Sequence, residues 1–338
     1  MQYQNAELHN VAEMEPVNGG MLLTRAPESL RQAVNAEAQT RLKCCSDCEI
    51  RFVSTEEVKV TLSTLWGEAD MTVLHGVFAE SERPVIREEP QTYTIKPPPD
   101  PLLRLDPEWC TKHHFDPRVT RLVFGGRRRE PIILHKIEGQ DIRPPTPEAL
   151  PKLRYLAYGS SITEGFHCEG PQLSYVAQTA WHLKADLINL GVAGSCLAEP
   201  AFADYIAERT DWHIASLELS ANMTSFPMDE FRKRLDYLVN RIGGADLTRP
   251  VACVTVFPSY ADCVTPTERP ADAPPGGAYR QALREIVDAC PHPNVHLLEG
   301  PDLLTEIGGL SDDLVHPSYH AMIEMGRNLA ARLATMVA

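Results

Sequence analysis

Apolar and polar positions follow different patterns in the two halves of this chain. From Pro151 onward, short apolar runs typical of buried strands alternate with longer amphipathic stretches typical of helices. The predicted strands are residues 153–158, 186–190, 214–219, 251–257 and 295–298. The predicted helices are residues 173–184, 202–209, 228–242, 279–289 and about 318–337. These five βα units predict a three-layer α/β/α sandwich with a five-stranded parallel sheet.

The first 140 residues show strand-like alternation instead. Val58, Val60 and Leu62 alternate with polar neighbours, and similar short runs occupy residues 49–53, 71–78, 92–95, 121–124 and 132–137. A period of two is typical of half-buried antiparallel strands. Residues 27–42 look helical or irregular, and prolines 97–99 interrupt any strand near them. The pattern predicts an antiparallel, jelly-roll-like β-sandwich.

A proline-rich segment separates the two patterns. Residues 143–148 read Arg-Pro-Pro-Thr-Pro-Glu, which favours a stiff linker between domains. The sequence therefore predicts an N-terminal β-sandwich domain over residues 1–145 and an α/β domain over residues 146–338.

Composition narrows the possible partners. The 338 residues carry 32 basic and 46 acidic side chains, a net charge of −14, which argues against nucleic acid and anionic membranes. No apolar run reaches the roughly 18 residues of a membrane helix, and the first residues lack a signal segment. We expect a cytoplasmic protein; the sequence does not indicate its oligomeric state.

The nine cysteines are too sparse for a disulfide scaffold, so most are expected to be reduced thiols. Cys45 and Cys48 form a Cys-x-x-Cys pair that, with Cys110, His113 and His114, would offer the ligand types of a zinc site. No second pair has metal spacing, and buried packing explains the cysteines more simply. We therefore expect no metal and no cofactor.

Two short motifs indicate the chemistry. Gly159-Ser160-Ser161-Ile162-Thr163 follows a predicted strand and starts a helical stretch, so Ser161 lies on a turn of the kind that exposes a nucleophile. A serine hydroxyl needs an adjacent base. The segment 313–317 supplies His316 as that base and Asp313 to orient its imidazole, although the neighbouring Asp312 is an alternative and either aspartate could cap the last helix.

With these motifs at strand ends, the sequence resembles the SGNH/GDSL hydrolases, whose first block is Gly-Asp-Ser and whose last is Asp-x-x-His. The resemblance implies an oxyanion hole formed by the N–H groups of Ser161 and Gly194 and the side chain of Asn222. Ser160 and Met223 stand where the family has aspartates. Some members carry an N-terminal β-sandwich, including carbohydrate esterases of family two and an acyltransferase that tailors a tetracycline.

The resemblance implies a serine esterase in which Ser161 forms an acyl-enzyme, acting on short-acyl esters, acetyl above all, of a sugar or small metabolite. Glu164 and His167 follow the nucleophile and are expected to line the substrate pocket. A Ser–His dyad that barely needs Asp313 remains an alternative.

Two other functions compete. An acyltransferase would use the same residues to pass the acyl group to a small-molecule hydroxyl, and only water exclusion and acceptor affinity separate it from an esterase. A catalytically silent binding protein would retain the fold alone, which the set of Ser161, Gly194, Asn222 and His316 disfavours. A metal-dependent hydrolase is disfavoured because histidines and acidic residues do not cluster at ligand spacing around the motifs.

Overall fold

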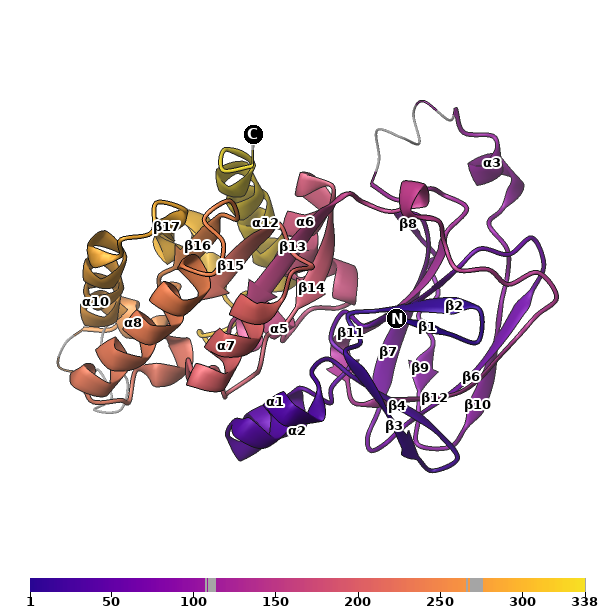
Figure 1. Ribbon diagram of the computed structural model, residues 1–338, viewed down its shortest axis with the longest axis horizontal. Coiled ribbons are helices and arrows are strands. Elements are labelled where there is room, and N and C mark those ends of the chain that lie inside the picture. Colours follow the sequence, from indigo (N-terminus) through magenta and orange to yellow (C-terminus); the bar gives the residue numbers. More distant parts are fainter. Residues whose placement is uncertain (107, 109–113, 266, 268–275, 338) are drawn as a thin grey trace.

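A computed structural model of the chain describes residues 1–106, 108, 114–265, 267 and 276–337. An antiparallel β-rich part, formed by the first half of the chain, lies beside an α/β part formed by the second half (Figure 1).

The α/β part contains one parallel sheet. Its strand order is β14 (Ala185–Asn189), β13 (Leu153–Tyr158), β15 (Ile214–Glu218), β16 (Val251–Val254) and β17 (Val295–Leu298), and every neighbouring pair is parallel. Because the strands run the same way, their carboxyl ends share one edge, where open α/β sheets place their active sites.

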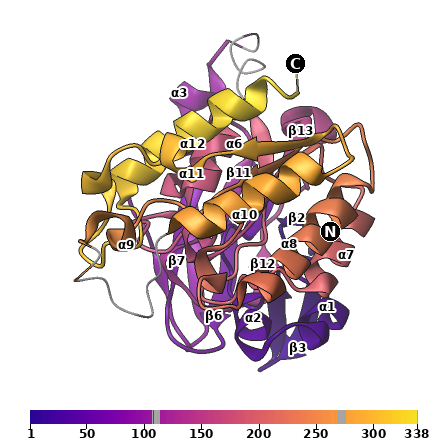
Figure 2. The same cartoon turned by 90° about the vertical axis from the view of Figure 1, so that its left-hand side faces the viewer.

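Helices cover both faces of this sheet (Figures 1 and 2). Leu156 and Tyr158 pack with α7 (Pro200–Glu208), α8 (Met228–Gly243) and α10 (Gly276–Ala289). The alternate residues Tyr155 and Ala157 pack with α6 (Tyr175–Leu183) and α12 (Tyr319–Ala334). Both faces of β14, β15 and β16 are thus buried, as the continuous apolar runs predict, whereas the edge strand β17 is only partly buried. The short helices are α5 (Ser161–Glu164), α9 (Tyr260–Cys263) and α11 (Gly300–Leu303).

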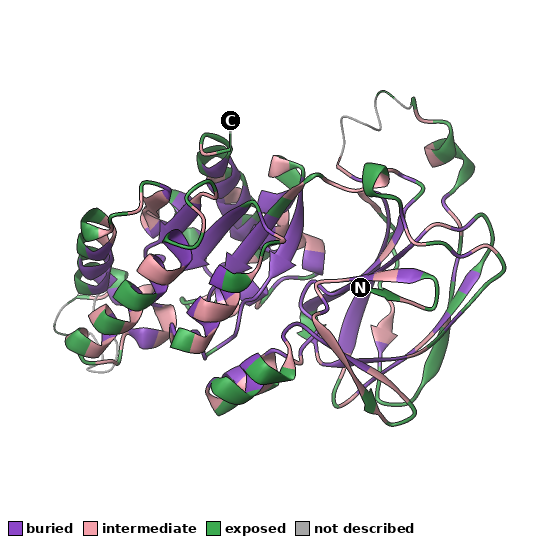
Figure 3. Cartoon of the chain, in the orientation of Figure 1, coloured by how far each residue is buried: buried purple, intermediate pink, exposed green. Residues whose placement is uncertain are grey.

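The N-terminal part contains two antiparallel sheets. The first has the order β1 (Gln2–Tyr3), β2 (Ala6–His9), β5 (Glu49–Phe52), β11 (Thr120–Arg129), β7 (Ala69–His75) and β8 (Phe78–Ala79), with β9 (Val85–Ile86) also on β7. The second has the order β10 (Gln91–Ile95), β6 (Val58–Thr64), β12 (Ile132–Glu138), β4 (Gly20–Thr24) and β3 (Glu13–Val17). Side chains of both sheets share one apolar core, so the predicted fold class is confirmed (Figure 3).

One N-terminal segment packs into the other half of the chain. It contains α1 (Glu28–Ala33) and α2 (Ala36–Arg41), which extend from the β-rich part toward α7 (Figure 1). Its apolar residues Leu30, Val34, Ala38 and Leu42 belong to the same buried cluster as α7 and α8. The boundary between residues 145 and 146 therefore remains a prediction, because part of the first half belongs to the core of the second.

The contact between the two parts is also polar and buried. Arg51 of β5 donates two hydrogen bonds to Asp186 of β14, at 2.6 and 2.9 Å, and both side chains are almost inaccessible. Arg25 donates to the backbone oxygens of Asn189 and Gly191, at 3.1 and 2.8 Å. A buried charge left without its partner is strongly destabilising, so these pairs hold the two parts in one arrangement.

Among the described residues, no helix combines the length and apolarity needed to cross a membrane.

Candidate active site

The first motif forms a tight turn between β13 and α5. Ser160 caps the helix, since its hydroxyl accepts a hydrogen bond from the N–H of Ile162, at 3.3 Å, and its side chain is buried. A Cβ at Gly159 would clash with Thr163 and Glu218, so glycine is needed there. Ser161 begins the helix and is partly accessible. Ser160 therefore supports the turn, and Ser161 faces the site.

The last motif meets this turn from the loop before α12. The Ser161 Oγ lies 2.7 Å from Nε2 of His316, and Nδ1 of His316 lies 2.6 Å from Oδ2 of Asp313. The other Asp313 oxygen accepts the backbone N–H groups of Val315 and His316, both at 2.9 Å. Asp313, and not Asp312, orients the imidazole, and the N-cap of α12 is Ser318. This is the geometry of a serine–histidine–aspartate triad.

The Asp313 carboxyl is held in its charged form. Partial burial raises its pKa, but hydrogen bonds from the backbone and imidazole of His316 and from the N–H of Val315 lower it more. The pKa of Asp313 therefore lies well below its ordinary value. A carboxylate that stays ionised fixes the His316 tautomer with Nδ1 protonated, which leaves Nε2 free to take the Ser161 proton.

The proposed oxyanion donors border the same cavity, of about 550 Å³, as Ser161 and His316. Gly194 has a φ of +69°, which favours glycine. Asn222 lies in the short 3₁₀ turn Ala221–Met223 at the end of β15, and its Oδ1 accepts the N–H of Cys196 at 3.1 Å. That bond leaves the Asn222 NH₂ group as the donor available to a substrate oxygen.

Two residues of α2 form part of the cavity wall, and sequence reasoning missed them. Glu37 and Arg41 join Phe166 and Val315 among the lining residues. Arg41 and Glu37 form an ion pair at 3.0 Å, one helical turn apart. The N-terminal half therefore contributes charged groups to the site. The i, i+4 spacing of this pair is visible in the sequence, but its long-range position is not.

The structure contradicts the predicted substrate contact of Glu164. The Glu164 side chain is fully buried beside Arg129 of β11, and its oxygens accept hydrogen bonds from Arg129 and from the N–H of Ala193. Neither oxygen is available to a ligand in the cavity. The hydrogen bonds from Arg129 and Ser46 of the N-terminal half hold the Glu164 side chain on the side of α5 that faces the β-rich part.

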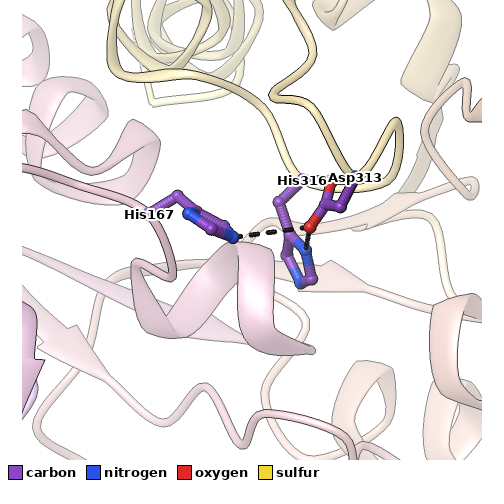
Figure 4. Close-up of side chains that lie close together, drawn as sticks. All are labelled: His167, Asp313 and His316. Carbon is purple, nitrogen blue, oxygen red and sulfur yellow. Dashed lines mark hydrogen bonds and ion pairs between the residues drawn. The ribbon is translucent and has the colours of Figure 1, made fainter.

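His167 lies next to the triad. Its Nε2 is 3.4 Å from Oδ2 of Asp313, so Asp313 contacts two imidazoles, as Figure 4 shows. In the described part of the chain, His167, Asp313 and His316 are the only group whose potential metal-ligating atoms all lie within 4.8 Å of one another. The Asp313–His316 hydrogen bond explains the core of this cluster as a triad. A substrate contact through His167 remains a prediction.

The cysteine pair lies in the β-sandwich core. Cys45 and Cys48 are fully buried, and burial raises the pKa of both thiols, that of Cys48 to about 12. Two further ligands of the zinc alternative, Cys110 and His113, lie outside the described residues. Core packing accounts for the buried pair.

A buried carboxyl, Glu218 at the end of β15, supports the nucleophile turn. Its Oε2 accepts the N–H of Ser160 at 2.6 Å and the hydroxyl of Thr163 at 3.2 Å. Desolvation raises the pKa of Glu218 to about 7, although the hydrogen bonds from Ser160 and Thr163 oppose this. Sequence reasoning missed this residue because it reads as part of an apolar strand.

The α/β/α fold and the triad at the carboxyl edge of its sheet define an SGNH-type hydrolase. Residues 157–321 match the GDSL-like Lipase/Acylhydrolase family, so the part of the chain that holds the site belongs to that family. The protein is therefore an ester hydrolase or an acyltransferase. A search of curated proteins gives no match.

Solved structures share the fold over both halves. A salicylyl-acyltransferase from a tetracycline biosynthetic pathway is 16% identical, with a TM-score of 0.79 over 98% of this chain and 95% of that one. A family two carbohydrate esterase from Clostridium thermocellum, in complex with cellohexaose, is 16% identical, with a TM-score of 0.59 over 86% and 93% of the two chains. An acetyl xylan esterase from Butyrivibrio proteoclasticus is 9% identical, with a TM-score of 0.57 over 88% and 92%.

Proposed function

We propose that this protein hydrolyses short-acyl esters, acetyl esters above all, of a sugar or small metabolite. One observation carries the proposal: Ser161, His316 and Asp313 are joined by hydrogen bonds of 2.7 and 2.6 Å beside two oxyanion donors. His316 takes the proton of Ser161 as the serine Oγ attacks the ester carbonyl, and it then gives this proton to the alcohol oxygen as the ester C–O bond breaks. Water then attacks the acyl-enzyme with His316 again as base, which releases the acid and restores the serine.

Stabilisation of the tetrahedral intermediate supports this sequence of steps. Negative charge develops on the carbonyl oxygen, next to the Gly194 N–H, the Ser161 N–H and the Asn222 amide. Donors already oriented toward that oxygen are worth more in the transition state than in the ground state, and removal of one typically lowers kcat about 10²–10³-fold. The bond from Cys196 to Asn222 supplies this orientation before substrate arrives.

The cavity wall supports a hydroxyl-rich alcohol group. Arg41 and Glu37 place hydrogen-bond donors next to acceptors at 3.0 Å, and their charges offset each other. Neighbouring sugar hydroxyls, which both donate and accept hydrogen bonds, require such alternating partners. Two of the structurally similar proteins are carbohydrate esterases, one of them an acetyl xylan esterase, which supports the same substrate class.

The test compares hydrolysis of p-nitrophenyl acetate, butyrate and octanoate by wild type and Ser161→Ala. We expect turnover fastest on acetate, with a loss of about 10⁴-fold or more in the variant. Arg41→Ala should then raise KM for an acetylated sugar while leaving p-nitrophenyl acetate hydrolysis within about twofold. Equal effects of Arg41→Ala on both substrates would contradict the sugar assignment, and fastest turnover of octanoate would contradict the short-acyl assignment.

Acyl transfer is the second candidate, supported by the salicylyl-acyltransferase, which shares the fold over 98% of this chain. Adding a small-molecule alcohol to the p-nitrophenyl acetate assay separates the two. A transferase gives an acetylated alcohol as the main product and faster p-nitrophenol release. An esterase gives acetate as the main product at the same alcohol concentration.

A further inference from the structure

A buried ion pair connects the β-rich half to both catalytic loops. Glu164 lies three residues after Ser161, and its side chain is 0% exposed. Its Oε1 accepts a 2.8 Å hydrogen bond from Nε of Arg129, at the end of β11, and a weaker one from Ser46 at 3.4 Å. Both donors belong to the N-terminal half. The Glu164 carboxylate therefore lies where the two parts of the molecule meet.

The other oxygen of Glu164 holds the oxyanion loop. Its Oε2 accepts the backbone N–H of Ala193, at 2.5 Å, directly before Gly194. The preceding N–H, of Val192, bonds the carbonyl of Gly159 at 2.8 Å. Hydrogen bonds from two successive backbone N–H groups, those of Val192 and Ala193, thus hold this loop against the nucleophile turn. The hydrogen bond nearer to Gly194 depends on the Glu164 side chain, which Arg129 holds in place.

Arg129 also contacts a wall of the site. Its guanidinium carbon lies 4.6 Å from the centre of the Phe166 ring, and the Phe166 ring lies 4.6 Å from the imidazole of His316. One arginine of the β-sandwich therefore supports the oxyanion loop through Glu164 and the packing of the general base through Phe166.

We propose that Arg129 and Glu164 are positioning residues through which the β-sandwich holds the oxyanion hole of the α/β half in its active arrangement. The proposal rests on the hydrolytic function proposed above. Neither side chain touches the substrate. Without its charge, residue 164 loses most of its attraction for Arg129 and binds the Ala193 N–H more weakly, because bonds to ionised groups are about twice as strong as neutral ones. The Gly194 donor is then less well placed, and misplacement of about 1 Å costs up to about 10²-fold in rate.

A matched control lies at the opposite edge of the same interface. Asp186 is as buried as Glu164 and pairs with Arg51 of the β-sandwich, at 2.6 and 2.9 Å. It is the second residue of β14, so it lies near the start of the strand whose carboxyl end leads into the oxyanion loop. Asp186→Asn and Glu164→Gln thus each remove one buried charge from the interface, and only the second touches a catalytic loop.

The experiment measures kcat and KM on p-nitrophenyl acetate, the rate of fluorophosphonate labelling, and thermal midpoints for wild type, Glu164→Gln, Arg129→Lys and Asp186→Asn. For Glu164→Gln we expect kcat and the labelling rate to fall about 10–100-fold with KM within about twofold. Arg129→Lys keeps the positive charge but lacks the planar guanidinium, so we expect kcat to fall about 3–10-fold. Asp186→Asn should keep kcat within about twofold even where its thermal midpoint falls.

Wild-type kcat in Glu164→Gln would overturn the proposal, as would an equal loss in Asp186→Asn. If Glu164→Gln does not fold, Arg129→Lys decides, and unchanged kcat in that variant contradicts the positioning role. A wild type that neither turns over esters nor labels would instead refute the proposed function, and the positioning role would be refuted with it.

Discussion

The buried carboxyl of Glu218 makes the stability of the folded protein depend on pH, and the substitution Glu218→Gln removes that dependence. Its side chain is 0% exposed, and its Oε1 has no hydrogen-bond partner among the described residues. Desolvation raises its pKa from 4.5 to about 7. The folded protein therefore prefers protonated Glu218, and this contribution to stability is complete below about pH 4.5 and is lost as pH rises through 7. Glu218→Gln imitates the protonated form at every pH.

The magnitude follows from the two pKa values. The rise of the Glu218 pKa from 4.5 to about 7 corresponds to a loss of about 3 kcal/mol in the free energy of unfolding at a pH well above 7. The free energy of unfolding of Glu218→Gln should thus equal that of wild type near pH 4.5 and exceed it by up to about 3 kcal/mol at pH 8.5. For a chain of 338 residues, with an unfolding entropy of about 2.1 cal/mol/K per residue, that gain raises the thermal midpoint by about 4 °C. The gain should appear progressively between pH 5 and 8.

The assay compares thermal midpoints of wild type, Glu218→Gln and the exposed control Glu306→Gln from pH 4.5 to 8.5, at one scan rate. The control removes a carboxylate that lies on the surface, so its difference from wild type should stay within about 2 °C. A Glu218→Gln difference that does not change with pH, or a variant less stable than wild type at pH 8.5, would refute the reasoning.

Three other substitutions test the site. Asn222→Ala should lower kcat about 10²–10³-fold with KM little changed; a loss below about threefold would remove Asn222 from the oxyanion hole. Asp313→Asn should lower kcat about 10²–10⁴-fold, and steady-state rates near wild type would show that Ser161 and His316 suffice. Ser220 has a φ of +105°, a region of backbone conformation that favours glycine, so Ser220→Gly should raise the unfolding free energy by about 1 kcal/mol in urea denaturation. A loss of stability in Ser220→Gly would show that the strain is compensated locally.

The α/β half of the fold was predictable because its signals are local. Each parallel strand is a continuous apolar run and each helix an amphipathic stretch, and the structure places both within a few residues of the predicted positions. In the other half, the short strands β1 to β4 were missed. Turns with positive φ at Asn5, Asn10 and Asn18, and a proline in β3, interrupt their alternation.

The chemical motifs were predictable for the same reason, and their surroundings were not. Ser161, Asp313 and His316 come together as expected, and the Ser161 turn directly follows β13 at the carboxyl edge of the sheet. The placement of the last motif at a strand end was wrong, because α11 separates Asp313 and His316 from the end of β17. Glu164 was misassigned because its partner, Arg129, lies in a strand of the other half. Leu30, Val34, Ala38 and Leu42 show a helical period of four, but nothing local indicates that this face packs on α7 and α8.

Covalent labelling tests most directly the claim that Ser161 is the nucleophile of an acyl-enzyme. The folded wild type and Ser161→Ala are treated with a fluorophosphonate and analysed by intact mass and peptide mapping. The account predicts one adduct per chain, on the peptide that carries Ser161, with none in the variant. A folded wild type that stays unlabelled, or an adduct that persists in Ser161→Ala, would contradict it.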